Sequence, residues 1–261
     1  NELMDWNMKR ILRYTLWVTI IVWVCSCQEY KMVEYGEGGQ INFMGKNGKL
    51  WTDDTSFFHY NKNFGINVDG DSLRADTVVI GVKVSGVTTD YPRRVVFKPV
   101  SSGEHGVDVA FLDDYYVSAD SSVATFSVEI RRPATRGTVY STNLEFDYDQ
   151  SDFEAGISER QGFRLTVRDS VSLKLWGTSE EEWRDYYSNY LGEYSETKIR
   201  YLITRYHEVS LNEWENSSNF TELRKGNSFY TDYESYRQDP KNKPLIDENT
   251  GREIEFPNLD V

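Results

Sequence analysis

Residues 162–176 have the sequence GFRLTVRDSVSLKLW, in which apolar and polar side chains alternate over almost the whole length. The apolar residues share one parity: Phe163, Leu165, Val167, Val171, Leu173 and Leu175. Such a period of two is typical of a strand with one face buried and one face in water. Because only Asp169 breaks the alternation, we predict one long strand, or a strand with a bulge at this residue.

The same alternation recurs toward the N-terminus, in residues 77–85, 124–131 and 143–148. Turn-forming clusters such as Asp69-Gly70-Asp71 and Asp120-Ser121-Ser122 separate these runs. Short strands with this punctuation predict a mainly β fold, an immunoglobulin-like antiparallel β-sandwich over residues 39–176.

Beyond Trp176 the apolar period lengthens, which indicates helices. Ser179 precedes three glutamates and Ser195 precedes a stripe of apolar residues, so each serine is a predicted N-cap. A third helix is expected near residues 231–237, and a hairpin over residues 245–254 around Asn249-Thr250-Gly251. Residues 177–261 are therefore predicted to form a small α+β appendage of helices and a hairpin.

The N-terminal residues have the order of a bacterial lipoprotein signal peptide. Basic residues including Lys9 and Arg10 are followed by an apolar run, residues 16–24, and then by Cys25-Ser26-Cys27. We expect residues 1–7 to be extra upstream sequence, residues 1–26 to be removed, Cys27 to be lipidated and residues 27–38 to form a tether. The alternative is a membrane-spanning anchor, which needs about 20 apolar residues; this run is shorter and is interrupted by Thr19.

Composition narrows the classes of function. Cysteine occurs only at positions 25 and 27, so we expect neither a disulfide nor a thiolate metal site in the mature chain. The formal net charge of −13 disfavours nucleic acid as a partner. Aromatic residues make up 15% of the chain, including 18 tyrosines, and such rings stack on sugars or anchor protein interfaces.

Several segments together resemble an uncharacterised family of Bacteroidetes lipoproteins, a domain of unknown function. The resemblance spans residues 27–206 and rests on residues 35–43, residues 76–86, Tyr91-Pro92-Arg93-Arg94 and, most specifically, Gly192-Glu193-Tyr194-Ser195-Glu196-Thr197-Lys198. The chain departs from the family pattern at Asp114-Tyr115-Tyr116, where such proteins often have His-Tyr.

The resemblance implies an Ig-like fold and a place near polysaccharide-utilisation systems of the starch-uptake type, with outer-membrane transporter lipoproteins as possible partners. It implies no activity. The expected location is the outer membrane, with the lipid at Cys27 as anchor and display on the cell surface; the periplasmic face is the alternative.

Candidate chemistry is sparse in this sequence. His59, His105 and His207 lie far apart, and none of the common nucleophile, phosphate or nicotinamide motifs is present. Residues 67–71 alternate oxygen ligands as calcium loops do, but the later bidentate acid is missing, so a β-turn is the simpler interpretation. We therefore expect no catalytic residues, no metal site and no cofactor.

Sugar binding would use exposed aromatic rings beside acids or amides. The residues chosen as a ligand site on this ground are Trp51, Asp53, Asp54, Asp114, Tyr115 and Tyr116. Trp183, Tyr186 and Tyr187 are further candidates, although Trp176 and Trp183 are more simply explained as packing the appendage onto the sandwich. At Tyr115 and Tyr116, one ring must point outward and the other inward if they lie on a strand.

The sequence thus favours a non-catalytic accessory lipoprotein that binds polysaccharides or oligosaccharides for capture or uptake. The competing hypothesis is a structural or protein-interaction subunit that docks on an outer-membrane transporter complex.

Overall fold

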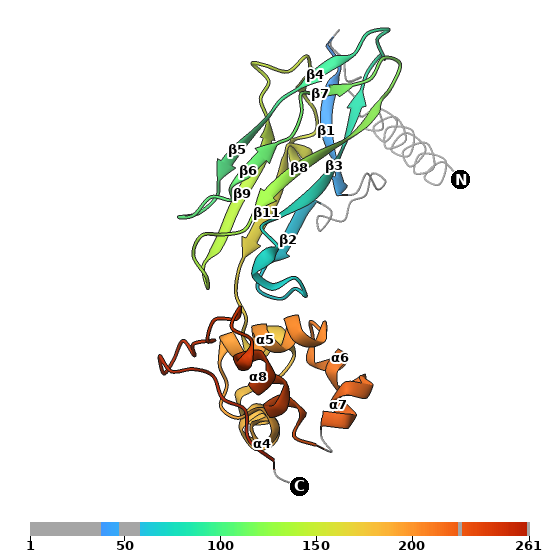
Figure 1. Cartoon of the computed structure of the whole chain (residues 1–261). Helices are drawn as coiled ribbons and strands as arrows, with labels where there is room; N and C mark the ends of the chain where they lie inside the picture. The colour runs from blue at the N-terminus through green and yellow to red at the C-terminus, as the bar shows by residue number, and fades with distance from the viewer. Residues whose placement is uncertain (1–37, 47–57, 224–225, 260–261) are drawn as a thin grey trace, which may run out of the picture. The chain divides into compact units, whose positions relative to one another are not determined.

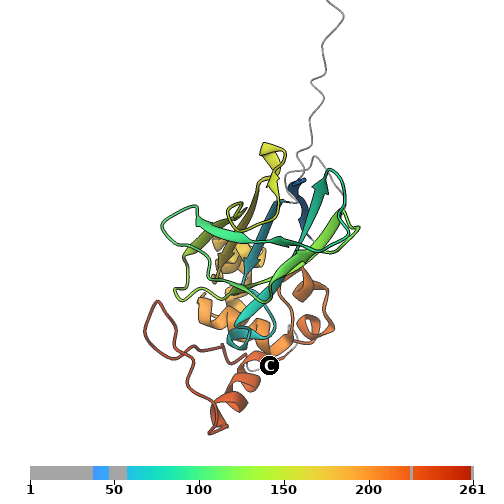
Figure 2. The same ribbon diagram turned by 90° about the horizontal axis from the view of Figure 1, so that it is seen from above.

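The structure is a computed structural model, and it describes residues 38–46, 58–223 and 226–259. These described residues belong to one compact unit. Within it, strands occupy the blue-to-yellow part of the chain and helices the orange-to-red part (Figure 1; the same ribbon is seen from above in Figure 2). The prediction of a mainly β chain followed by helices is confirmed.

The strands form two larger sheets and a ribbon. The first sheet has the order β10-β1-β3-β8-β6 and the second β2-β11-β9-β5, while β4 pairs with β7. The bounds of these strands are β1 Gln40–Lys46, β2 His59–Asn63, β3 Ala75–Ser85, β4 Arg93–Val95, β5 Phe97–Ser101, β6 Val109–Phe111, β7 Tyr115–Val117, β8 Val123–Arg131, β9 Val139–Phe146, β10 Glu154–Ala155 and β11 Gly162–Arg168.

Alternating side chains of both sheets meet in one apolar core. Val78, Ile80 and Val82 of β3 are at most 1% exposed, as the sequence pattern predicts. Between the sheets, the ring centroid of Phe43 lies 4.3 Å from that of Phe146. Burial of one face of each sheet is therefore what holds the strands together.

Not all strand pairs are antiparallel, so the prediction of a purely antiparallel arrangement is wrong at two of them. β1 pairs in parallel with β10, and β11 pairs in parallel with β2. About a hundred residues or more separate the partners in sequence. A tight hairpin forces an antiparallel pair, whereas so long a connection allows either direction.

The long strand predicted for residues 163–175 ends earlier. β11 stops at Arg168, and Ser172 caps a short helix, α2 (Leu173–Trp176), by accepting a hydrogen bond from the Leu175 backbone. Gly177 ends this helix at φ +101°, a backbone angle that favours glycine. Val171, Leu173 and Trp176 belong to a second core and not to the sheets.

The helices form around that second core. After α2 they are α3 Glu180–Glu182, the π-helical turn η4 Trp183–Tyr187, α4 Ser188–Leu191, α5 Glu196–Tyr206, α6 Leu211–Asn216, α7 Ser218–Leu223 and α8 Ser228–Gln238. Single turns of 3-10 helix, η2 (Gly70–Ser72) and η3 (Ser158–Arg160), lie between the strands. The predicted caps Ser179 and Ser195 both accept hydrogen bonds from the third residue of their helices. α6 and α7 have no counterpart among the predicted helices.

The second core is rich in aromatic residues. Trp176 and Trp214 are fully buried with ring centroids 5.8 Å apart, and Trp183 lies 6.1 Å from Trp176. The expectation that Trp176 and Trp183 pack against the strands is therefore wrong: both belong to the second core, which forms within residues 171–256 and not between the sheets. The predicted hairpin is present, with an antiparallel bridge between Ile246 and Glu253.

Candidate functional site

Of the predicted ligand residues, the structure describes Asp114, Tyr115 and Tyr116; Cys27, Trp51, Asp53 and Asp54 lie outside the described residues. Tyr115 and Tyr116 open β7 and point to opposite sides, as expected. Tyr115 is 8% exposed and its hydroxyl donates to the carbonyl of Ser127, whereas Tyr116 is 46% exposed. The Asp114 Oδ1 lies 3.5 Å from the Arg94 Nη2, so the two side chains form an ion pair. Tyr115 is thus a core residue, and Tyr116 is the ring of this pair that a ligand could reach.

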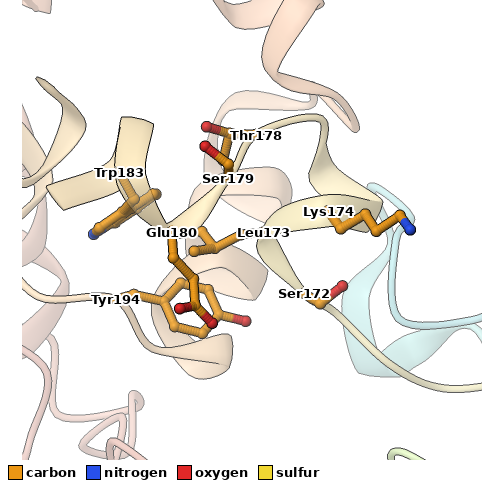
Figure 3. Close-up of a pocket in the computed structure, with 8 residues that line it drawn as sticks. All are labelled: Ser172, Leu173, Lys174, Thr178, Ser179, Glu180, Trp183 and Tyr194. Atoms are coloured by element: carbon orange, nitrogen blue, oxygen red, sulfur yellow. The ribbon is translucent and has the colours of Figure 1, made fainter. Parts of the chain in front are cut away.

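A largely apolar concave site lies in the helical region (Figure 3). It is a pocket of about 540 Å³ lined by Ser172, Leu173, Lys174, Thr178, Ser179, Glu180, Trp183 and Tyr194. Three chain segments meet there: the start of α2, the turn into α3 and the turn before α5. Its volume lies within the range of small-molecule sites, roughly 300–1,000 Å³.

Helix capping fixes the polar rim of this pocket. Ser179 and Glu182 form a capping box, in which the serine hydroxyl accepts from the Glu182 backbone and the glutamate accepts from the Ser179 backbone. The Thr178 hydroxyl donates to the same glutamate at 2.9 Å. These hydrogen bonds, chiefly the one from Thr178, lower the pKa of Glu182, so it stays ionised and keeps the turn in place.

Aromatic rings form the apolar part of the pocket. Trp183 is 4% exposed, its indole N–H donates to the Gly192 carbonyl at 3.1 Å, and its ring stands edge-on to Tyr194 at 5.7 Å. Burial, followed by the charges of Glu196 and Glu248, raises the pKa of Tyr194 to about 12, so its phenol remains a neutral donor at physiological pH. Tyr194 is therefore the ring that a ligand can reach, and the buried Trp183 supports it from behind in a fixed position.

Two exposed charged residues border the pocket: the Glu180 carboxylate lies beside the Tyr194 ring, whereas the Lys174 ammonium points away from both rings (Figure 3). Lys174 and Glu180 line the pocket, and neither forms an ion pair within the described part of the chain. An ammonium and a carboxylate at the rim can donate to and accept from the hydroxyls of a ligand. A partly exposed aromatic ring beside a hydroxyl-binding carboxylate is a combination expected of a sugar site.

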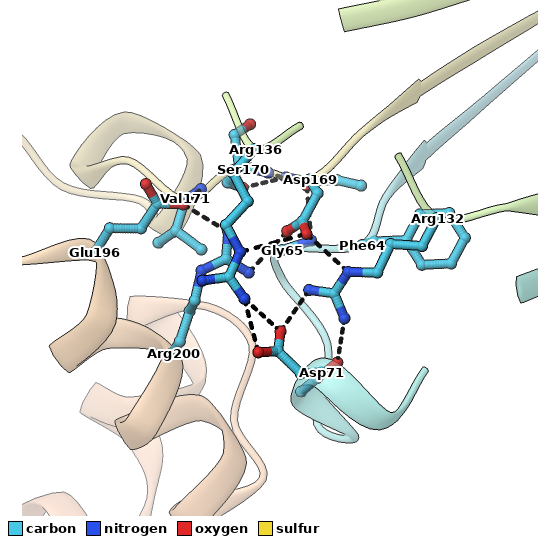
Figure 4. Close-up of polar contacts among 12 residues, drawn as sticks. Phe64, Gly65, Asp71, Arg132, Arg136, Asp169, Ser170, Val171, Glu196 and Arg200 are labelled. Carbon is cyan, nitrogen blue, oxygen red and sulfur yellow. Dashed lines mark hydrogen bonds and ion pairs between the residues drawn. The ribbon is translucent and has the colours of Figure 1, made fainter. Parts of the chain in front are cut away.

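A second polar cluster has a different role (Figure 4). Asp169, 2% exposed, follows β11 and binds Arg132 Nε at 2.7 Å and, from α5, Arg200 Nη1 at 2.8 Å. Asp71 in η2 joins Arg132 to Arg136 with contacts of 2.8 and 2.7 Å. Because these charges pair with one another, the cluster is a junction between strands and helices.

The electrostatics of Asp169 agree with that role. Burial by itself raises its pKa, but the hydrogen bond from Arg132 and the positive charges of Arg200 and Arg132 lower it below the ordinary value. Asp169 is therefore an ionised structural group and not a proton donor at neutral pH.

Within the described ranges, no group of three or more His, Cys, Asp or Glu side chains is placed to hold a metal ion. The helices in those ranges are also too short or too polar to cross a bilayer.

Sequence reasoning found only part of the pocket. It named Trp183 as a secondary sugar candidate and Tyr194 within the segment Gly192–Lys198. Lys174 and Glu180 are not among the predicted ligand residues, because the sequence pattern explains Lys174 as a polar position of a strand and Glu180 as an acid in the first turn of a helix. The signal that could have found the pocket is the short distance in sequence between Trp183 and Tyr194.

Comparisons with known proteins identify a family. The family described as Domain of unknown function (DUF4843) matches residues 52–207, a range that includes all eight pocket residues. None of the curated proteins matches the sequence.

Several solved structures are distantly similar. A candidate carbohydrate-binding protein of Bacteroides ovatus has a TM-score of 0.35 and 10% identity, covering 51% of this chain and 38% of its own. EndoBT-3987 of Bacteroides thetaiotamicron, solved with a Man5GlcNAc product, has a TM-score of 0.32 and 10% identity, covering 49% of this chain and 30% of its own. The Calx CBD1 domain has a TM-score of 0.29 and 7% identity, and the match covers 50% of this chain and 96% of the Calx domain. This chain thus spans well under half of the Bacteroides ovatus protein.

Proposed function

This chain belongs to the family described as Domain of unknown function (DUF4843), which carries no stated activity, and we propose that it is a non-catalytic binding protein that captures glycans. The observation that carries the proposal is the pocket in which Trp183 and Tyr194 lie beside Lys174 and Glu180. The Tyr194 ring, backed by Trp183, offers the apolar face that a sugar needs, and the charged groups of Glu180 and Lys174 suit its hydroxyls.

The lining of the pocket favours binding over cleavage. Glycoside hydrolysis normally uses two carboxyl groups on either side of the scissile bond, about 5–10 Å apart. Glu180 is the one carboxylate among the eight described residues that line the pocket. We therefore propose capture without hydrolysis.

The cellular setting is part of the same proposal. A lipobox-like segment ending at Cys27 supports anchoring to the outer membrane, and the resemblance to Bacteroidetes lipoproteins supports display near a polysaccharide-uptake system. The two facing sheets support an immunoglobulin-like sandwich that carries the pocket-bearing helical region.

A second candidate function is docking on a transporter complex. Large apolar side chains are exposed near the β4–β7 ribbon: Val87 is 83% exposed, Tyr91 57% and Tyr116 46%. Exposed apolar patches often mark protein interfaces. Tyr116→Asp should weaken copurification with a transporter if this function holds, and should leave glycan binding through the helical pocket intact.

A screen of the full chain in detergent against plant, host and microbial polysaccharides tests the leading proposal. We expect a specific hit that Lys174→Ala and Glu180→Ala weaken, with Glu181→Ala as the matched control, because Glu181 is exposed on the same helix and does not line the pocket. Binding that survives both pocket variants would place the glycan elsewhere. Release of reducing sugar from the bound glycan would contradict a non-catalytic role.

A further inference from the structure

Lys198 is a buried cation within the segment Gly192–Lys198. It is 3% exposed, and its ammonium donates to the carbonyls of Leu191 at 2.7 Å and Glu193 at 2.6 Å. The Leu191 carbonyl belongs to the last turn of α4, where carbonyls lack helical partners. The side chain of Lys198 therefore reaches back to fix the end of the preceding helix.

The two carbonyls flank Gly192, which has φ +72° and ψ −161°, a backbone conformation reserved almost entirely for glycine. A Cβ at this position would lie 3.2 Å from the Lys198 Nζ. The Gly192 carbonyl in turn accepts the hydrogen bond from Trp183. The Lys198 ammonium thus holds the turn at Gly192. This turn supports Trp183 through the hydrogen bond and leads directly into Tyr194.

We propose that Lys198 is a positioning residue that sets Trp183 and Tyr194 in the geometry that the pocket needs for its ligand. This inference rests on the proposed function of that pocket. It assigns separate roles to the residues of the segment: Gly192 makes the turn, Ser195 caps α5, Lys198 fixes the turn and Tyr194 contacts the ligand.

A purely stabilising role is the competing explanation. Replacing a buried charge by an apolar side chain of similar size often costs little or even stabilises a protein, provided that no partner charge is stranded. The Nζ also lies 5.3 Å from the ring centre of Phe256, so Lys198 packs under the C-terminal segment as well. The two roles must therefore be separated by a readout at the pocket.

The protonation of Lys198 gives such a readout. Burial lowers its pKa from 10.5 to about 8, opposed by the charges of Asp247, Glu193, Glu255 and Glu248. Arg252 and Glu253 line the same cavity beside the lysine. Loss of the proton weakens charge-assisted hydrogen bonds to the two carbonyls.

A rise in pH has opposite effects on the turn and on the stability of the fold. Because the folded pKa lies below the unfolded one, the unfolded chain binds more protons between these values, and the contribution of this group to folding rises with pH there. Loosening of the turn above pH 8 is therefore separable from unfolding.

The experiment uses the full chain labelled with 5-fluorotryptophan, with the Trp183 fluorine resonance assigned by its loss in Trp183→Phe. We expect this resonance to titrate with a midpoint near pH 8 in the unmodified protein and to be displaced and pH-independent in Lys198→Met. Lys198→Arg should restore much of the original position at pH 7, since it keeps the charge and the donors. A Trp183 resonance that is unchanged in Lys198→Met would overturn the proposal.

The binding arm uses neutral tetrasaccharides of glucose, mannose and galactose as probes. For any probe that binds, Lys198→Met should lower the affinity at least about tenfold at pH 7, with Lys241→Met as the exposed control. Unchanged affinity in Lys198→Met would also overturn the proposal. If no probe binds the unmodified chain, glycan capture fails for these sugars, whereas the fluorine titration still decides whether Lys198 positions Trp183.

Discussion

Asp169→Ala should be among the most damaging single substitutions in this chain. The carboxylate is 2% exposed, and it neutralises Arg132 and Arg200, whose side chains are only 6% and 11% exposed. Removing it leaves each guanidinium with one carboxylate partner, Asp71 for Arg132 and Glu196 for Arg200. Breaking a buried ion pair costs up to about 3–5 kcal/mol when the remaining charge is left uncompensated, so this range is the upper bound for Asp169→Ala.

Urea denaturation at neutral pH measures this cost. Tryptophan fluorescence follows the helical core through Trp176, Trp183 and Trp214, and circular dichroism follows the strands. Asp185→Ala is the matched control, because Asp185 pairs with Arg184 at the surface, with side chains 60% and 71% exposed. We expect about 0–1 kcal/mol for the control. A loss in Asp169→Ala no larger than in Asp185→Ala would refute the junction as a source of stability.

Three further substitutions test the pH dependence of this ion network, a helix cap and the helical core. The arginine partners of Asp169 keep its pKa low, so its contribution to the free energy of unfolding is complete above the unfolded pKa of about 3.9 and fades as pH falls through the folded pKa. Asp169→Asn has no group that titrates here. Urea denaturation at a series of pH values should therefore show a smaller loss of stability on acidification in Asp169→Asn than in the unmodified protein. Ser195→Ala removes a fully buried N-cap and should lower the free energy of unfolding by about 0.5–2 kcal/mol, against almost none for exposed Ser235→Ala. Trp214→Ala empties a fully buried site, and calorimetry should show a loss of about 3–5 kcal/mol; a loss below 1 kcal/mol would mean that the helical core is not packed as described.

The strands could be predicted because burial of one sheet face leaves a period of two in the sequence. The same rule failed after Arg168. Val171 and Leu173 continue the parity of β11 although they pack in the helical core, and side-chain parity alone does not separate a strand from a turn that leads into a helix. The signals for the change were local: a serine at the N-cap of α2 and a glycine after it.

The pocket was harder to foresee for a different reason. Its walls come from three segments, and the distance between them depends on tertiary packing. Of the two tyrosines predicted as ligand residues on β7, Tyr115 lies in the core and Tyr116 on the surface. The segment Gly192–Lys198 was recognisable as a unit, but its physical sense required knowledge of where the Lys198 ammonium lies.

The most direct test of the account is the affinity of the full chain for its best-binding glycan before and after Tyr194→Ala, measured by calorimetry beside Tyr116→Ala. Tyr194 lines the helical pocket, whereas Tyr116 is an exposed ring on β7. Loss of a stacking ring should cost roughly 1 kcal/mol or more, which is about fivefold or more in affinity. We predict this loss in Tyr194→Ala and unchanged affinity in Tyr116→Ala. The reverse pattern would contradict the helical pocket as the site of glycan capture.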